Sequence, residues 1–445
     1  APPMTTHMPA PPDRERVIAV GAAPMGGRLR SISLVLAVLG LATFAYGAFT
    51  GNDRAWHAFH FNWLFFTLVS SAGVMFVAAQ RITTARWSRG VIRFLEGMVA
   101  FLPFAWLGLV LMIVFGKGHL YPWWGALASL PHEKQVYLGH KFFALRSVLV
   151  FTAIAGLQLW YVWTSVRLDV GISPEAGSSW AAGLRARMRA AFGDERRELH
   201  SAHSIQGKIA VWMAIVWAFG WIVLSWDQSM TLDPMFFSTM YGWQVFMGGW
   251  VVALMVFAGL VRFWRNRLGA EDLVTETHFH DIGKLCFGFT AFWGYITFAQ
   301  YLVIWYGNVP EETHFFTQRF THAWTPFTVA IVVLAFVLPF FGLLSVKAKV
   351  FSPTMLFFAA GSTLGIFIQR YIEVYPAVYG SVSNAPFGFW EIAVTLGFLG
   401  VWGFSYTSFM DAFPKFRTLL ITSPYRDEVQ VPVDPKTMEP LPAHE

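Results

Sequence analysis

The sequence predicts an all-α membrane protein with about ten transmembrane helices, and two observations lead to this prediction. First, 56% of the 445 residues are hydrophobic and 13% are charged, with a mean hydropathy of +0.49. Soluble domains carry about 25% charged residues, so this chain lacks the polar surface of a soluble globule. Second, ten apolar runs each approach the roughly 20 residues that a helix needs to cross a bilayer. They lie at about 31–50, 59–80, 91–115, 143–166, 208–226, 241–264, 284–306, 323–346, 354–371 and 389–410.

Backbone chemistry decides how these runs fold. In lipid, only α-helices and closed β-barrels satisfy every backbone N–H and C=O group. The runs are too long and continuous for barrel strands, so we expect a ten-helix membrane domain over residues 31–410. Spans two to five and six to nine have similar lengths and loops of matching sidedness, which favours a repeat over 59–226 and 241–371. The predicted fold is therefore two four-helix bundles plus two extra helices.

Basic residues gather in alternate loops, which predicts the orientation of the chain. The loop after the third predicted span is an exception, with Lys117, Lys134 and Lys141. By the positive-inside rule, both termini and the basic loops lie in the cytoplasm. The basic residues after the second, fourth, sixth and eighth spans include Arg81, Arg86, Arg89, Arg167, Arg185, Arg187, Arg189, Arg196, Arg197, Arg262, Arg265, Arg267, Lys347 and Lys349.

Three segments lie outside the predicted spans. Residues 1–30 form a polar, proline-rich N-terminal segment, and no small-residue cleavage pattern clearly follows the apolar run that begins near Ser31. We therefore expect that run to be a retained span. The loop 167–207 predicts a short basic amphipathic helix on the cytoplasmic surface. Residues 411–445, rich in proline and mixed charge, predict an extended tail that lies against another subunit.

Several kinds of chemistry are excluded by residues that the sequence lacks. A single cysteine, Cys286, rules out an internal disulfide or a cysteine-ligated cluster. None of the thirteen histidines lies in the middle of a predicted span, where a membrane b-haem would need its ligands. The pairs His57 with His60 and His200 with His203 have one-turn spacing, and we expect them to be interfacial residues rather than metal ligands. No phosphate-binding glycine loop, nucleophile elbow or HExxH motif is present.

The net charge of +6 favours loops that face anionic lipid over a nucleic-acid partner. Ionisable residues at membrane depth are functional candidates by default. The stretch "SWDQSMTLDPMFFSTMYGW", from Ser225 to Trp243, places Asp227 and Asp233 between two apolar runs. Asp233 followed by Pro234 also fits a helix N-cap with proline at the first helical position.

Three more carboxylates belong to the same group of candidates. Glu96 lies in the third predicted span with Arg93 as its local partner, while Glu373 and Glu391 lie near span ends. A buried carboxylate that lacks a partner can carry protons, because burial raises its pKa. Gln158 and Gln300 fit either such a path or interhelical hydrogen bonds.

Three stretches together resemble a known family. They are "SWDQSMTLDPMFFSTMYGWQVF", "FAQYLVIWYGNVPEET" and "LPFFGLLSVKAKV". They are similar to stretches of the NrfD/PsrC-like integral membrane subunits, most closely the ActF branch found in bacterial alternative complex III, a quinol:electron-acceptor oxidoreductase. The resemblance covers nearly all ten predicted spans.

The resemblance implies a set of partners and a membrane. It implies multihaem cytochrome and iron–sulfur subunits, a paralogous NrfD-like subunit and lipids, in the bacterial inner (cytoplasmic) membrane. It implies no redox cofactor on this chain, and either a contact with menaquinol or another quinone or a proton path. In the ActC branch a histidine and an aspartate mark the quinol site. Asp227 matches that acid, and His140 is the nearest histidine we expect, because the neighbouring predicted spans contain none.

Three functions remain open at this point. In the first, the chain is a subunit of a quinol-oxidising respiratory or photosynthetic complex. There Asp227, Asp233, Glu373 and Glu391 handle protons at the outer face, and Glu96 belongs to an inner half-path. In the second, the chain is a structural scaffold whose acids cap helices, and quinol oxidation belongs to the paralogue. A secondary transporter is the third and least favoured, since the acids lie near span ends rather than at the midplane.

Overall fold

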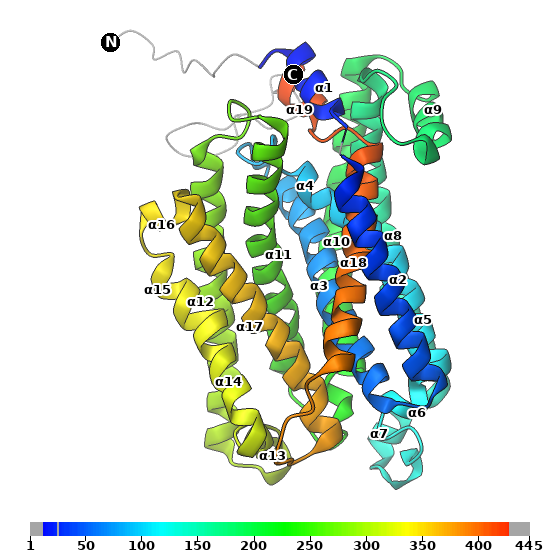
Figure 1. Cartoon of the computed structure of the whole chain (residues 1–445), viewed down its shortest axis with the longest axis vertical. Helices are drawn as coiled ribbons and strands as arrows, with labels where there is room; N and C mark the ends of the chain where they lie inside the picture. The colour runs from blue at the N-terminus through cyan, green and yellow to red at the C-terminus, as the bar shows by residue number, and fades with distance from the viewer. Residues whose placement is uncertain (1–11, 25, 427–445) are drawn as a thin grey trace.

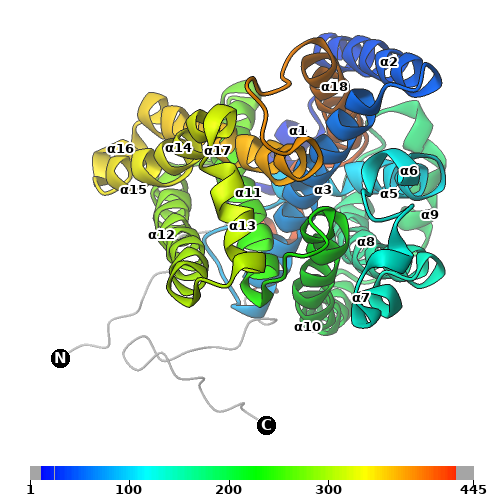
Figure 2. The same cartoon turned by 90° about the horizontal axis from the view of Figure 1, so that it is seen from below.

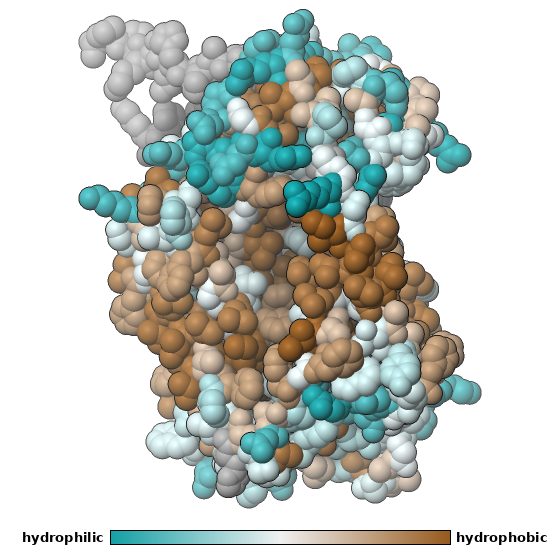
Figure 3. Space-filling view, viewed as in Figure 1, coloured by the Kyte–Doolittle hydropathy of each residue, from teal (hydrophilic) through white to brown (hydrophobic). Residues whose placement is uncertain are grey.

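Helices form every regular element of residues 12–24 and 26–426, which are the residues that the computed structural model describes (Figure 1). Within these residues, ten helical stretches are long and apolar enough to cross a membrane. The predicted all-α membrane fold is thereby confirmed. The space-filling view agrees with it, because on the face shown hydrophobic residues cover the middle of the molecule and hydrophilic residues gather toward both ends (Figure 3).

The first group of spanning helices contains the second to fifth spans. Its members are α3 (Asp53–Ile82), α5 (Leu102–Leu111), α8 (His140–Ile172) and α10 (Glu195–Gln228). Neighbouring members pack in a closed ring, because α3 contacts both α5 and α10, and α8 contacts the same two helices.

The second group contains the sixth to ninth spans in the same circular order. Its members are α11 (Thr239–Leu268), α12 (Glu276–Gly307), α14 (Thr325–Ile331) with α15 (Leu338–Gly342), and α17 (Ser352–Tyr379). The remaining two helices, α2 (Gly27–Phe49) and α18 (Phe389–Ala412), pair with each other and pack on α3. Two bundles plus two extra helices is the predicted arrangement. That the bundles are a repeat stays a prediction.

Two of the spans change helix type along their length. The third span passes from α4 (Arg93–Glu96) through the 3₁₀ turn η1 (Gly97–Phe101) into α5, and then through the π-helix η2 (Met112–Gly116) into α6 (Lys117–Leu120). The eighth span has a second π-helix, η7 (Val332–Val337), between α14 and α15. Pro103 lies two residues after the end of η1, and Pro339 lies two residues after the end of η7. Proline lacks the backbone N–H that would continue the α-helical hydrogen bonds at these points, so the helix type changes beside it.

Short helices form the connections at the two ends of the molecule (Figure 1). At one end lie α1 (Arg14–Ala22), α9 (Ala182–Ala190) and α19 (Thr418–Thr422), and we call this the α1–α19 end. At the other end lie α7 (His132–Tyr137) and α13 (Pro310–Arg319), and we call this the α7–α13 end. The remaining short elements are η3 (Leu127–Ser129), η4 (Ser179–Ala181), η5 (Met230–Leu232), η6 (His322–Trp324) and α16 (Val346–Val350).

Helix α3 occupies the centre of the molecule. Viewed from the α7–α13 end, it lies between the other helices of the first bundle, the second bundle and the α2–α18 pair (Figure 2). The most apolar part of the helix is entirely buried. Its serines hold the surrounding helices. The indole N–H groups of Trp217 and Trp221 donate to the Ser71 hydroxyl at 2.8 and 3.1 Å, and that of Trp402 donates to Ser70 at 3.0 Å. Such interhelical bonds give specificity where lipid supplies no hydrophobic difference between helices.

The C-terminal region differs from its predicted extended form, whereas the long loop contains the predicted short basic helix. Residues 411–426 fold back over the α1–α19 end instead of extending, and α19 contacts α1 and α8. The reason is that Arg417 reaches Glu96 at 3.7 Å and the Leu419 N–H donates to Asp169 at 3.0 Å. The predicted tail beyond residue 426 lies outside the described residues. Helix α8 extends into the predicted loop 167–207 as far as Ile172, and α10 already begins within it at Glu195. Between them, α9 is the short basic helix.

The N-terminal segment is helical where the structure describes it. Helix α1 covers Arg14–Ala22, and α2 begins at Gly27, four residues before the predicted start of the first span. Arg14 joins α1 to the start of α10 through Glu195 at 2.6 Å. Residues 1–11 and 25 of the predicted polar segment lie outside the described residues.

The backbones of α2 and α18 approach each other closely, and glycines make this contact possible. A Cβ atom added to Gly40 would lie 2.1 Å from the Gly397 Cα, and one added to Gly400 would lie 2.2 Å from the Ala37 nitrogen. Small residues let backbones of membrane helices approach in this way.

We therefore expect Gly40→Val to separate α2 from α18 and to destabilise the protein by about 3 kcal/mol, through overpacking against backbone. Thermal unfolding of the purified protein in detergent measures the effect. The matched control is Gly156→Val on α8, where an added Cβ meets nothing within 4 Å among the described residues. Equal melting temperatures for the two variants would contradict the glycine contact.

Candidate functional site

The connection between α10 and α11 brings the two bundles together at the α7–α13 end. Helix α10 ends at Gln228, and the chain then passes through η5 and a turn before α11 begins at Thr239. The prediction that Asp233 and Pro234 start the helix is wrong. Asp233 instead accepts the Met235 N–H at 3.3 Å, in a turn that buries Phe236 against the Phe315 ring with centroids 4.0 Å apart.

Asp227 forms a fully occupied ion pair inside the first bundle. The Arg146 guanidinium of α8 donates to both of its oxygens at 2.6 and 3.0 Å, and the Ser147 hydroxyl donates at 3.1 Å. The Tyr137 hydroxyl adds a bond at 3.0 Å, and burial raises the pKa of this phenol, so that it stays protonated and donates. These bonds compensate the desolvation of a completely buried carboxylate. Asp227 is thus a link between α8 and α10.

Gln228, the next residue, faces a buried histidine. Its side-chain oxygen accepts from the Tyr121 hydroxyl at 2.6 Å, and its amide donates to Ser147 at 3.2 Å. The ring of His60 on α3 lies 6.0 Å from the Tyr121 ring and is completely buried. In the described part of the chain, neither ring nitrogen of His60 has a hydrogen-bond partner.

The expected absence of histidine from the neighbouring spans is therefore wrong. Helix α3 begins at Asp53, six residues before the apolar run that defined the predicted span, so it adds His57 to the His60 that the run already contained. Both side chains are buried, and His57 bonds to the Tyr379 hydroxyl at 3.1 Å. The one-turn spacing of "HAFH" was the signal that could have placed them on one helix face.

His140 does not contact Asp227 among the contacts of the described residues. It is the exposed first residue of α8, where its ring stacks on Trp124 with centroids 4.0 Å apart. Its Nε2 lies 3.0 Å from the Trp124 carbonyl. His60 packs beside the Tyr121 that bonds to Gln228, the residue after Asp227.

Glu373 lies on α17 on the other side of the same connection. Its carboxylate pairs with Arg370 at 2.7 Å and approaches the Ser229 hydroxyl at 3.5 Å. Ser229 also bonds to the Tyr241 hydroxyl of α11. Within residues 12–24 and 26–426, Oε1 of Glu373 has no hydrogen-bond partner although the side chain is buried. Glu373 therefore has one carboxylate oxygen that accepts no hydrogen bond, whereas both oxygens of Asp227 are occupied.

A cavity of about 720 Å³ borders Glu373, and we call it the α12–α17 cavity. Its walls come from α11, α12, α13, the eighth span and α17, and aromatic rings make up much of them. It reaches the outer surface of the bundle beside Tyr295 and Phe298, which are 66% and 62% exposed. A molecule dissolved in lipid therefore has a direct way in. The aromatic lining residues are Tyr241, Trp293, Tyr295, Phe298, Tyr301, Phe315, Phe316, Phe320, Phe336 and Phe340.

A few polar groups converge on this apolar space. Gln369 Oε1, Thr297 Oγ1 and Trp293 Nε1 are buried and make no hydrogen bond within the described residues. Arg319, from the end of α13, also lines the cavity and donates to the Glu373 carbonyl at 3.4 Å. Burial lowers the pKa of the Arg319 guanidinium to about 10, which leaves it charged at neutral pH. Such a pocket suits a largely apolar ligand with polar substituents.

Glu391 and Glu96 have structural partners. Glu391 caps the first turn of α18 by accepting the Gly388 N–H at 2.7 Å, and it binds Arg54 and the Tyr375 hydroxyl, each at 2.7 Å. Glu96 lies towards the opposite end of the molecule, on the third span. It pairs with Arg93 at 2.5 Å and accepts from the Ser165 hydroxyl at 2.8 Å.

The structure thus brings Asp227 and Glu373 to two sides of the connection between α10 and α11, and it places Glu96 towards the opposite end of the molecule. No group of three or more His, Cys, Asp or Glu side chains in the described residues is arranged to hold a metal ion. No model of a known protein family matches the chain, and no curated protein matches its sequence.

We predict that Asp227→Asn destabilises the protein by about 3–5 kcal/mol, because Arg146 then remains buried without its counter-charge. Thermal unfolding in detergent measures this. The control is Asp272→Asn, which breaks a 2.7 Å pair with Arg16 whose side chains are 52% and 47% exposed, and should cost about 1 kcal/mol or less. If the two variants melt together, the ion pair does not hold α8 to α10.

Proposed function

We propose that the chain is an integral membrane subunit of a quinol-oxidising electron-transfer complex in the bacterial cytoplasmic membrane. In this proposal it anchors multihaem cytochrome and iron–sulfur subunits beside a paralogous NrfD-like subunit, and the α12–α17 cavity receives the quinol. The observation that carries the proposal is a large aromatic cavity, open on the lipid-facing side, with Glu373 at its inner wall.

The dimensions and lining of the cavity suit a quinol. Its volume of about 720 Å³ lies in the range of roughly 300–1,000 Å³ typical of small-molecule sites. Aromatic walls stack on a flat ring and accept an isoprenoid chain, while Gln369 and Glu373 can bond to the two hydroxyl groups of the ring. The opening at Tyr295 and Phe298 lets the chain of the quinol remain in the bilayer.

The free carboxylate oxygen of Glu373 gives the site a proton acceptor. Oxidation of a quinol to a quinone releases two protons and two electrons. Glu373 accepts one proton at Oε1 while Arg370 holds the carboxylate in place, and the second proton passes to water. The electrons pass to a haem or an iron–sulfur cluster of a partner subunit, which is the oxidant in this scheme.

The geometry changes which acid is favoured for this role. Asp227 has both oxygens occupied by Arg146, Ser147 and Tyr137, so it has no acceptor facing a ligand. Glu373 combines a free oxygen with a large cavity. We therefore assign the proton-accepting role to Glu373 and a structural role to Asp227.

A purely structural scaffold is the second candidate function. The observation that favours it is the pairing of the other acids, since Asp227, Glu391 and Glu96 each hold two helical segments together through an arginine. A transporter is less favoured, because the α12–α17 cavity lies within one bundle rather than between the two.

Glu373→Gln is expected to lower quinol oxidation by the purified complex by about 10²-fold, since it removes the proton acceptor but retains the shape of the site. Binding of a quinone analogue should change by less than about threefold, because the apolar walls remain. The matched control is Glu311→Gln on α13, an exposed acid at the same end of the molecule, and it should leave both measurements unchanged.

A second variant tests the cavity itself. Ala291 lines it, so Ala291→Phe should fill part of the space and abolish binding of the analogue while the complex still assembles. If both Glu373→Gln and Ala291→Phe retain full turnover and binding, the quinol proposal is overturned and the scaffold is supported.

A further inference from the structure

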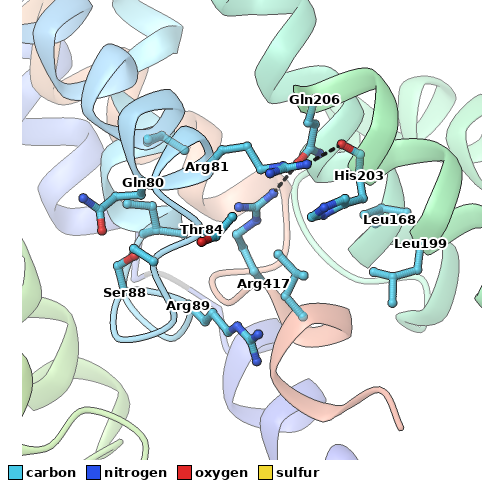
Figure 4. Close-up of a pocket in the computed structure, with 14 residues that line it drawn as sticks. Gln80, Arg81, Thr84, Ser88, Arg89, Leu168, Leu199, His203, Gln206 and Arg417 are labelled. Carbon is cyan, nitrogen blue, oxygen red and sulfur yellow. Dashed lines mark hydrogen bonds between the residues drawn. The ribbon is translucent and has the colours of Figure 1, made fainter. Parts of the chain in front are cut away.

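A small cavity at the α1–α19 end gathers positive charge without any acid in its lining (Figure 4). Its volume is about 50 Å³, and we call it the arginine cavity. Its basic members come from three parts of the chain: the end of α3 and the following loop, α10, and the segment before α19. The polar and basic residues that line it are Gln80, Arg81, Thr84, Ser88, Arg89, His203, Gln206 and Arg417.

Two guanidinium groups converge there. Figure 4 shows the guanidinium groups of Arg81 and Arg417 pointing toward one another. Arg81 donates to the His203 carbonyl at 2.9 Å, and Arg417 donates to the Gln206 side-chain oxygen at 3.0 Å. Both acceptors are neutral, and Arg417 also reaches the Glu96 carboxylate at 3.7 Å, so Arg81 is the cation that these bonds orient without neutralising. Like charges held together in this way favour an anion between them.

Two donors near the guanidinium groups have no acceptor. Gln206 is 3% exposed, and its Nε2 makes no hydrogen bond with any described residue. The Nε of Arg81 is likewise buried and without a partner in the described part of the chain. Buried donors without acceptors cost free energy, and an oxyanion in the cavity would satisfy both.

The nearest carboxylates are already engaged. Glu96 lies 3.7 Å from Arg417, but it also pairs with Arg93 and accepts from Ser165. Asp169 pairs with Arg93 and accepts the Leu419 N–H. Because neither acid lines the arginine cavity, the charge of Arg81 has no acidic partner among the lining residues that the structure describes.

We propose that the arginine cavity binds a phosphate group, supplied by the headgroup of an anionic lipid or by free phosphate. Phosphate oxygens would accept from Arg81, Arg417 and Gln206, with the Ser88 and Thr84 hydroxyls at the rim. Guanidinium groups bind phosphate through charge-assisted pairs of hydrogen bonds. The site lies where α3 leaves the apolar belt, which is the depth of lipid headgroups. It is separate from the α12–α17 cavity and does not depend on the quinol proposal.

Three variants of the full chain in its native complex test this site. Arg81→Gln removes one cation and should weaken phosphate-dependent stabilisation at least tenfold in apparent Kd. Gln206→Glu places a carboxylate between the arginines, so it should raise the melting temperature without added anion and abolish the response to it. Arg187→Gln is the matched control, because Arg187 is an exposed residue of α9 at the same end and does not line the cavity.

Two probes separate the sources of the phosphate group. Each delipidated protein is titrated with inorganic phosphate, or reconstituted in nanodiscs of phosphatidylglycerol or of phosphatidylcholine, and its melting temperature is measured. Stabilisation of the wild type and of Arg187→Gln by inorganic phosphate identifies free phosphate. Stabilisation by phosphatidylglycerol alone identifies a lipid headgroup.

Loss of the response in Arg81→Gln and Gln206→Glu supports the site in either case. The proposal is overturned if neither probe stabilises the wild type, or if Gln206→Glu responds as the wild type does. A failure of Arg81→Gln to fold leaves Gln206→Glu as the deciding variant, because it is expected to be more stable than the wild type before any probe is added.

Discussion

The rest of the structure depends on the complete burial of α3. Seven spanning helices pack around it, namely α2, α5, α8, α10, α11, α17 and α18, so both bundles and the outer pair share this one helix. Lipid gives apolar helices no reason to prefer each other, so the hydroxyls of Ser70 and Ser71 and the indoles that bond to them set the positions of these helices. The position of α3 also brings His57 and His60 into the interior.

Charge inside the molecule follows one physical rule at both ends. A buried charge is tolerated when a counter-charge and hydrogen bonds offset its desolvation, as at Asp227 with Arg146 and at Glu391 with Arg54. Among the buried groups of the described residues where this compensation is incomplete are the oxygen of Glu373 and the donors of Arg81 and Gln206. Each borders a cavity, and we have assigned the ligands on that basis: a quinol at the α7–α13 end and a phosphate group at the α1–α19 end.

Apolar run length predicted the membrane helices well because hydropathy is a local property of the chain. It failed where a helix continues past its apolar part. The run at 59–80 missed the first turns of α3, and with them the buried His57. Turn chemistry also failed at Asp233 and Pro234, where packing of Phe236 on Phe315 holds a turn and delays the start of α11 to Thr239.

The sequence by itself determined the number of spans, the helical class and the set of acids at membrane depth, because each follows from residues close together in the chain. Tertiary structure alone decided which acid has both carboxylate oxygens occupied and which keeps one oxygen without a hydrogen-bond partner. Asp227 meets Arg146 across 81 positions, and Arg417 meets Gln206 across 211. Partners at such separation are set by how helices pack, and packing also forms the two cavities. The candidate sites therefore became visible only in the folded molecule.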